Sequence, residues 1–108
     1  MGVLTLNCWV RGGDIGTIRI FEVKILRTGT VAALKKAIKD KKPVAFRGVD
    51  AGALDLYKPR DPLPPYKENL SSIVLSEHAE CLEVARHELS EVFPKPPLER
   101  HIHIIVGM

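Results

Sequence analysis

Hydrophobic and polar residues alternate along residues 3–11 of this chain. The apolar set at alternate positions consists of Leu4, Leu6, Cys8 and Val10. A period of two indicates a β-strand with one buried face. Residues 18–26 repeat the pattern, with Phe21, Val23 and Ile25 on one face, and the glycines between the two segments favour a turn. We therefore predict an N-terminal β-hairpin.

The period of the apolar positions changes to that of a helix in the next segment. Val31, Leu34 and Ile38 recur at helical spacing, and Thr28-Gly29-Thr30 offers an N-cap ahead of them. Pro43 ends the pattern, so we predict a helix of about 11–12 residues. The opposite face of this helix is basic, and its lysines include Lys35, Lys36 and Lys39.

Two segments after this helix are apolar at regular spacing. Residues 53–58 predict a short strand with Leu54 and Leu56 directed inward, before a proline-rich loop that starts at Pro59. In residues 77–92 the apolar positions follow helical spacing, and they are Leu82, Ala85, Leu89 and Val92. We predict a second helix in this segment.

The chain closes with a β-branched run after a proline-rich stop. One face of residues 101–106 carries Ile102, Ile104 and Val106, and the other carries His101, His103 and Ile105. A buried strand at this end of the chain must find its partner far back in sequence. Parallel pairing with the first strand is what a long right-handed crossover gives. The two ends of the chain are therefore expected to meet in one sheet.

The predicted order is two strands, a helix, a strand, a loop with a helix, and a last strand. A helix with one apolar stripe covers one face of a sheet. We predict an α+β protein of the β-grasp class, with a mixed sheet of about four to five strands, one main helix packed on one face and a second short helix. We expect residues 1–108 to form a single domain.

Composition excludes several classes of protein. The net charge of +3 is too mild to identify a specific nucleic-acid binder, and no apolar stretch approaches the length of a membrane span. The N-terminal segment alternates like a strand and shows no classical signal peptide. Cys8 and Cys81 allow at most one disulfide, and we expect both to be buried, reduced thiols.

Motifs that would carry catalysis are absent from the sequence. Gly12-Gly13-Asp14 is neither a phosphate-binding loop nor a dinucleotide fingerprint. Cys8 stands on an apolar strand face, where a thiol is expected to be inert. His101 and His103 have a spacing that suits two metal ligands, but solvent-facing polar residues of a strand are the simpler interpretation. We expect a protein that is not an enzyme, with no catalytic residues, no metal and no cofactor.

Five separated motifs give the chain a family resemblance. The helix segment 28–41 and the last strand resemble those of ubiquitin. A fuller match is to the N-terminal domain of the Crinkler effectors, which are secreted proteins of oomycetes and some fungi. The motifs that carry it, in order, are Leu6-Asn7-Cys8-Trp9-Val10, the Thr30–Lys39 segment, Asp50-Ala51 with Leu54-Asp55-Leu56-Tyr57-Lys58, the Leu89–Pro97 segment, and His101-Ile102-His103-Ile104-Ile105-Val106.

This resemblance implies a non-catalytic, ubiquitin-like header. In the family such a header is associated with export and entry into host cells, ahead of a C-terminal effector domain in cis that usually acts in the nucleus. The chain is therefore expected to be secreted and then to reach a host cell. Leu54, Leu56, Tyr57 and Lys58 resemble the translocation motif of the oomycete header, but the segment is two residues shorter.

Two surfaces are candidates for contact with a protein partner. By resemblance to ubiquitin, the outer sheet face presents His103 and Ile105 on the last strand. Asp55, which faces outward on the third strand, departs from ubiquitin, where this residue is apolar. The lysine face of the helix could meet an acidic partner surface, anionic lipid or nucleic acid, but a solvated helix face is the simpler interpretation. The alternative function is a free-standing intracellular ubiquitin-like adaptor that binds a protein through the same sheet. The sequence leaves the identity of the partner and the oligomeric state open.

Overall fold

The computed structural model describes residues 2–10, 20–41, 47–63, 74–84, 86–95, 97 and 100–107. Its elements in chain order are β1 (Val3–Val10), β2 (Ile20–Leu26), α1 (Val31–Lys41), a 3₁₀ turn (Ala51–Ala53), β3 (Asp55–Pro59), α3 (Leu75–His78), β4 (Ala79–Cys81), α4 (Leu89–Val92) and β5 (Ile104–Gly107). The turn predicted at Gly12-Gly13-Asp14 lies outside the described residues.

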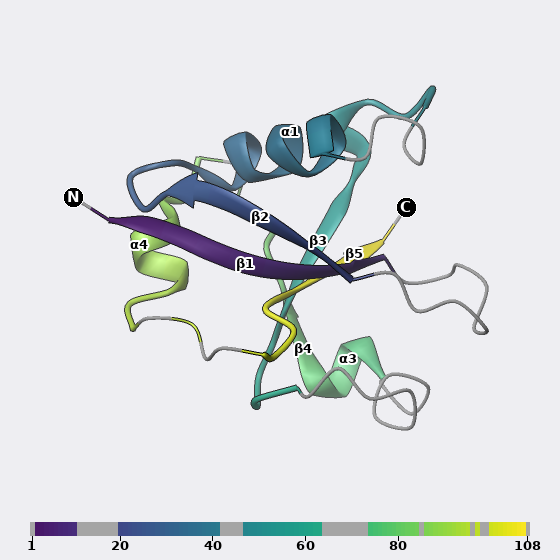
Figure 1. Ribbon diagram of the computed structural model, residues 1–108. Coiled ribbons are helices and arrows are strands. Elements are labelled where there is room, and N and C mark those ends of the chain that lie inside the picture. Colours follow the sequence, from purple (N-terminus) through teal and green to yellow (C-terminus); the bar gives the residue numbers. More distant parts are fainter. Residues whose placement is uncertain are drawn as a thin grey trace.

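The strands form one mixed sheet in the order β2-β1-β5-β3-β4. β1 pairs antiparallel with β2 and parallel with β5, while β3 pairs antiparallel with both β5 and β4. Figure 1 shows α1 lying across one side of this sheet and the short helices α3 and α4 at its periphery. The predicted α+β fold, with a mixed sheet, one main helix and a short second helix, is confirmed. The parallel pairing of the first and last strands is confirmed as well.

The predicted hairpin strands and helix are present with the expected faces. In β1, Leu4, Leu6 and Cys8 are buried, and the register with β2 runs without a break from Val3–Leu26 to Trp9–Ile20. The N–H of Ala33 donates to Oγ1 of Thr30 at 3.2 Å, which satisfies one of the free donors at the start of α1. Hydrophobic side chains at helical spacing then turn toward the sheet, and these are Val31, Leu34 and Ile38, each fully buried.

The prediction of a single helix over residues 77–92 is wrong. Ala79–Cys81 form β4 and pair with β3, and the N–H of Leu82 donates to the carbonyl of Leu56 at 2.8 Å. The helical spacing in this segment reflects burial, because Leu82, Leu89 and Val92 all reach the core from non-helical or very short helical segments. Hydrogen bonding to β3 thus outweighs a local pattern that is only moderately helical.

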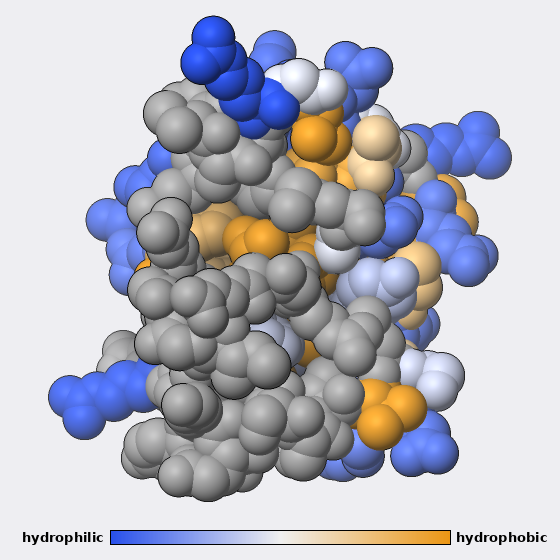
Figure 2. All heavy atoms as spheres, turned by 90° about the vertical axis from the view of Figure 1, so that its right-hand side faces the viewer, coloured by the Kyte–Doolittle hydropathy of each residue, from blue (hydrophilic) through white to orange (hydrophobic). Residues whose placement is uncertain are grey.

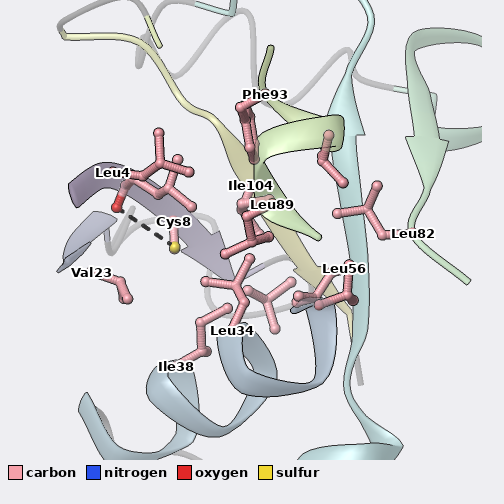
Figure 3. Packing of buried hydrophobic residues seen from close by; sticks show 14 of the residues in the cluster. Leu4, Cys8, Val23, Leu34, Ile38, Leu56, Leu82, Leu89, Phe93 and Ile104 are labelled. Atoms are coloured by element: carbon pink, nitrogen blue, oxygen red, sulfur yellow. Dashed lines mark hydrogen bonds between the residues drawn. The ribbon is translucent and has the colours of Figure 1, made fainter. Parts of the chain in front are cut away.

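Two clusters of buried side chains lie on the two faces of the sheet. The main cluster fills the space between the sheet and α1, and Figure 3 shows Leu34 and Ile38 pointing from α1 toward Leu56 and Ile104. A second, smaller cluster is built on Leu63, Ala79, Ile102 and Ile105, with Trp9 and Tyr57 packed against it. On the side seen in Figure 2, hydrophobic residues are visible near the centre and hydrophilic side chains project around them.

Candidate functional site

The segment that resembles a translocation motif is part of the folded core. Leu54 and Leu56 have no solvent exposure, and Leu56 stands opposite Val106 in the ladder between β3 and β5. Figure 3 places Leu56 in the same cluster as Leu82. Burying a leucine side chain stabilises a fold by roughly 1.5–3 kcal/mol. Both leucines are therefore structural residues of the native protein.

The last two residues of this segment connect β3 to other elements. Tyr57 is half-buried and packs against the second cluster. Nζ of Lys58 donates a hydrogen bond to the carbonyl oxygen of Val92 at 2.6 Å and lies 5.1 Å from the centre of the Phe93 ring. A cation over an aromatic ring and at the last carbonyls of a helix is stabilising in both positions. Lys58 therefore fixes α4 against β3.

The expected partner-binding sheet face is only partly exposed. Asp55 is exposed, but Ile105 has no solvent exposure and His103 has only 8%. The expectation of an open face at these positions is wrong because residues of the second cluster, such as Leu63 and Ala79, cover the sheet there. The structure does not bring Asp55, His103 and Ile105 together as one accessible patch.

His103 has a structural role in this covered region. Its ring Nδ1 accepts a hydrogen bond from the backbone N–H of Asn7 at 2.9 Å, and the backbone N–H of His103 donates to the carbonyl of Asn7 at 2.9 Å. The side-chain amide of Asn7 donates to the carbonyl of His101 at 2.9 Å. These three bonds hold the segment before β5 against β1, which explains why a histidine can be buried at this point.

The lysine face of α1 is a mixed surface. Lys36 is exposed, whereas Lys35 and Lys39 are half-buried. Lys35 is close enough to the Cys81 thiol to act on it electrostatically. The three lysines of α1 therefore differ in their access to a partner, and Lys35 is the one that lies near β4.

A cleft of about 270 Å³ lies at another part of the molecule. Its walls come from the end of β3 with the residues after it, from the segment that follows α4, and from residues 101–103. Four proline rings and Phe93 supply most of the apolar wall. The cationic side chains that line it are Lys58, Arg60 and Lys95, and Asp61 is the one carboxylate among its lining residues. The cleft is therefore apolar inside and positively charged at its rim.

This cleft brings together residues from both predicted sites, but sequence reasoning did not locate it. Lys58 comes from the translocation-like segment, and His103 comes from the predicted sheet face. Arg60 and Lys95 are the residues that were missed. Each of them lies beside or within a proline-rich stretch. Long-range contacts bring the walls of the cleft together, since Lys58 bonds to Val92 and the N–H of Ile102 donates to the carbonyl of Leu63 at 2.8 Å.

The two cysteines are free thiols in very different surroundings. Cys8 is buried, as expected, and burial raises the pKa of its thiol to about 12. The expectation for Cys81 is wrong, because it lies exposed on the short edge strand β4. Partial desolvation, then Glu83 and Asp55, raise the pKa of the Cys81 thiol, while Lys35 acts in the opposite direction.

We expect one fast-reacting thiol in the native protein. A chromogenic aromatic disulfide should modify Cys81 readily, whereas Cys8 should react only as fast as the protein opens locally or globally. The Cys81→Ser variant should show no fast phase, and the wild type in denaturant should show two reactive thiols. A fast phase that persists in Cys81→Ser would show that Cys8 is accessible.

Within the described ranges, no group of three His, Cys, Asp or Glu side chains is arranged to hold a metal ion. None of the described helices is long and apolar enough to cross a membrane.

Comparison with known proteins gives a family match over nearly the whole chain. A family model described as Crinkler effector protein N-terminal domain matches residues 4–107. The chain is also 33% identical over 104 residues to Crinkler effector protein 1 of Rhizophagus irregularis. That alignment covers 95% of this chain and 21% of the relative, so the chain spans about a fifth of the length of the curated protein that it matches.

Proposed function

The chain belongs to the family of Crinkler effector N-terminal domains, and from this premise we propose that it is the non-catalytic header of a secreted effector. In this role it supports export and entry into a host cell, contacts a protein partner, and precedes a C-terminal effector domain in cis. The observation that carries the proposal is the family match over residues 4–107. The much greater length of the Rhizophagus relative supports a further domain in the same polypeptide.

Delivery in this proposal depends on a surface of the folded header. A receptor that meets the native protein cannot reach Leu54 or Leu56, because both are fully buried. Lys58, the last residue of the same segment, lines the cleft. The segment therefore contributes to delivery by building the cleft, and its leucines act through the fold.

The chemistry of the cleft suits an acidic segment of a protein partner. Arg60 and Lys95 are exposed at its rim, Lys58 contributes a third positive charge, and Asp61 offsets only one of them. Rim charges of one sign attract and orient a partner of the opposite sign. The proline rings and Phe93 offer apolar contact to the side chains that flank the acidic residues.

Reversal of the rim charges should reduce delivery. We expect Arg60→Glu combined with Lys95→Glu to lower uptake or secretion of a reporter fusion by about tenfold, which corresponds to roughly 1.4 kcal/mol of binding free energy. The matched control is Lys36→Glu with Lys41→Glu, which changes the net charge equally on exposed positions of α1. Far-UV circular dichroism of both variants verifies that the fold is kept.

The control also separates the two candidate surfaces. Loss of delivery in the α1 variant alone would show that the partner binds the basic face of the helix. Equal loss in both variants would show that delivery depends only on the net charge of the protein. If the wild-type fusion delivers nothing, the function of an intracellular adaptor replaces that of an effector header. In that case an antibody against this chain should detect a small protein close to 12.0 kDa in the native organism, and not a much longer effector.

A further inference from the structure

β2 forms one edge of the described sheet. Within the part of the chain that the structure describes, its neighbour is β1, and the order continues through β5 and β3 to β4. β2 is seven residues long, contains no proline and pairs with β1 without a break. An edge strand of this kind presents a row of backbone N–H and C=O groups to a further strand.

The exposed side chains of β2 form a symmetrical series. Apolar residues stand at its two ends, opposite charges stand between them, and in order they are Ile20, Glu22, Lys24 and Leu26. Leu26 is 58% exposed, and Val3, its neighbour on β1, is 59% exposed. Of the five large hydrophobic residues that are exposed among the described ones, three therefore lie along this hairpin.

The two charges of this series have no counterpart across the hairpin. Asn7 of β1 stands opposite Glu22, and Thr5 stands opposite Lys24. Neither of these β1 residues carries a charge. A charged residue on an edge usually discourages another strand from pairing there, because it would meet a like charge or an apolar side chain. Here the outcome depends on the register of the incoming strand.

We propose that β2 pairs antiparallel with β2 of a second copy of this chain, about a two-fold axis at Val23. Glu22 then stands opposite Lys24 of the partner subunit, and Ile20 stands opposite Leu26 of the partner subunit. The symmetry repeats both contacts, so the interface contains two Glu–Lys pairs and two apolar pairs. Opposite charges and apolar side chains in such cross-strand positions are stabilising.

Neighbouring registers are disfavoured by the same residues. A shift of two residues in one direction places Glu22 opposite Glu22 of the partner subunit, and a shift in the other direction places Lys24 opposite Lys24 of the partner subunit. Like charges directly opposite each other destabilise a strand pair. A shift of one residue sets the exposed face of one strand against the core face of the other. The sequence of β2 therefore selects a single register.

The inward residues of β2 agree with this arrangement. Phe21 and Val23 are buried in the main core and Ile25 packs against it. In the proposed register Phe21 stands opposite Ile25 of the partner subunit. The core face of the sheet therefore stays apolar from one subunit to the other. A single strand pair is smaller than a standard protein interface, and we therefore expect weak, concentration-dependent association.

Charge exchange at two positions tests the pairing. Sedimentation equilibrium of the 108-residue chain, over a concentration series that reaches the near-millimolar range, should show a dimer. Glu22→Lys or Lys24→Glu alone should weaken association by roughly tenfold or more, because each places like charges opposite each other. An equimolar mixture of the two variants should associate again as a heterodimer, and the double variant should again form a homodimer.

Each other outcome overturns the proposal. A wild type that stays monomeric throughout the series excludes the dimer. This holds even if the edge of β2 binds an extended peptide from another protein. Single variants that associate like the wild type place the contact elsewhere on the molecule. A mixture that fails to associate when the wild type does excludes the Glu–Lys register. Glu22→Gln and Lys24→Gln, with circular dichroism, separate loss of charge from loss of fold, since both side chains are exposed.

Discussion

The variant with both Leu54→Ala and Leu56→Ala is expected to be unfolded in water at room temperature. Each leucine is fully buried in the main cluster, and truncation of such a residue costs about 2–5 kcal/mol. Proteins of this size are stable by only about 5–15 kcal/mol in total. The two losses together, about 4–10 kcal/mol, are therefore of the same size as the whole free energy of unfolding.

Urea titration followed by fluorescence of Trp9, the single tryptophan, measures this effect. Leu56→Ala alone should lower the midpoint with little change in slope, and the double variant should lose its cooperative transition. Leu26→Ala is a matched control, because the same truncation at a strand position that is 58% exposed should change stability by less than about 0.5 kcal/mol. A double variant as stable as the control would show that these leucines lie outside the core.

This expectation changes how alanine variants of the translocation-like segment are to be interpreted. A variant that removes Leu54 and Leu56 and fails to deliver its cargo has lost the fold that carries every surface contact. Substitutions at Arg60 and Lys95 do not have this problem, since both residues are exposed. Substitutions at the rim of the cleft therefore distinguish an effect on delivery from an effect on folding.

The second large effect is a loss of stability in alkaline solution. Burial raises the pKa of the Cys8 thiol from 9.0 to about 12, so the folded protein keeps this proton where the unfolded chain releases it. The neutral thiol stabilises the folded state fully below pH 9, and this contribution is lost as the pH rises toward 12. At about 1.4 kcal/mol per pH unit, the loss approaches roughly 4 kcal/mol.

The Cys8→Ala variant isolates this contribution from the other groups that titrate in alkali. It should be less stable than the wild type at pH 7, because it leaves a small cavity in the core. The difference between the two proteins should then shrink, and can change sign, as unfolding is measured at increasing pH above 9. Free energies of unfolding that fall in parallel for both proteins would show that the thiol does not titrate on unfolding in this range.

The parts of the fold that sequence predicts well are those whose burial follows a local period. Alternation placed Leu4, Leu6 and Cys8 on the inner face of β1, and helical spacing placed Leu34 and Ile38 against the sheet. Residues 77–92 show the limit of this reasoning. Their apolar residues are spaced for burial, but Ala79–Cys81 take a strand conformation because β3 offers them an open edge.

The candidate site was harder to predict, since it depends on segments that meet only in three dimensions. Alternation in residues 101–106 suggested that His103 and Ile105 face solvent. They are covered because Leu63 and Ala79, from two other segments, pack on that side of the sheet. Hydrogen bonds with Asn7 help to satisfy the buried His103, and no local sequence pattern indicates a partner 96 residues away.

The position of β5 in the sheet has a consequence for synthesis on the ribosome. β5 lies between β1 and β3, yet it is translated after both. The hairpin of β1 and β2 can therefore form early, but its sheet cannot join the pair of β3 and β4 until Gly107 has left the exit tunnel. The bond between Asn7 and His103 closes across 96 residues, and such distant pairing is slow. A chain terminated before Ile104 accordingly ends as two unconnected pieces of sheet, each with an open edge, and not as a slightly smaller protein.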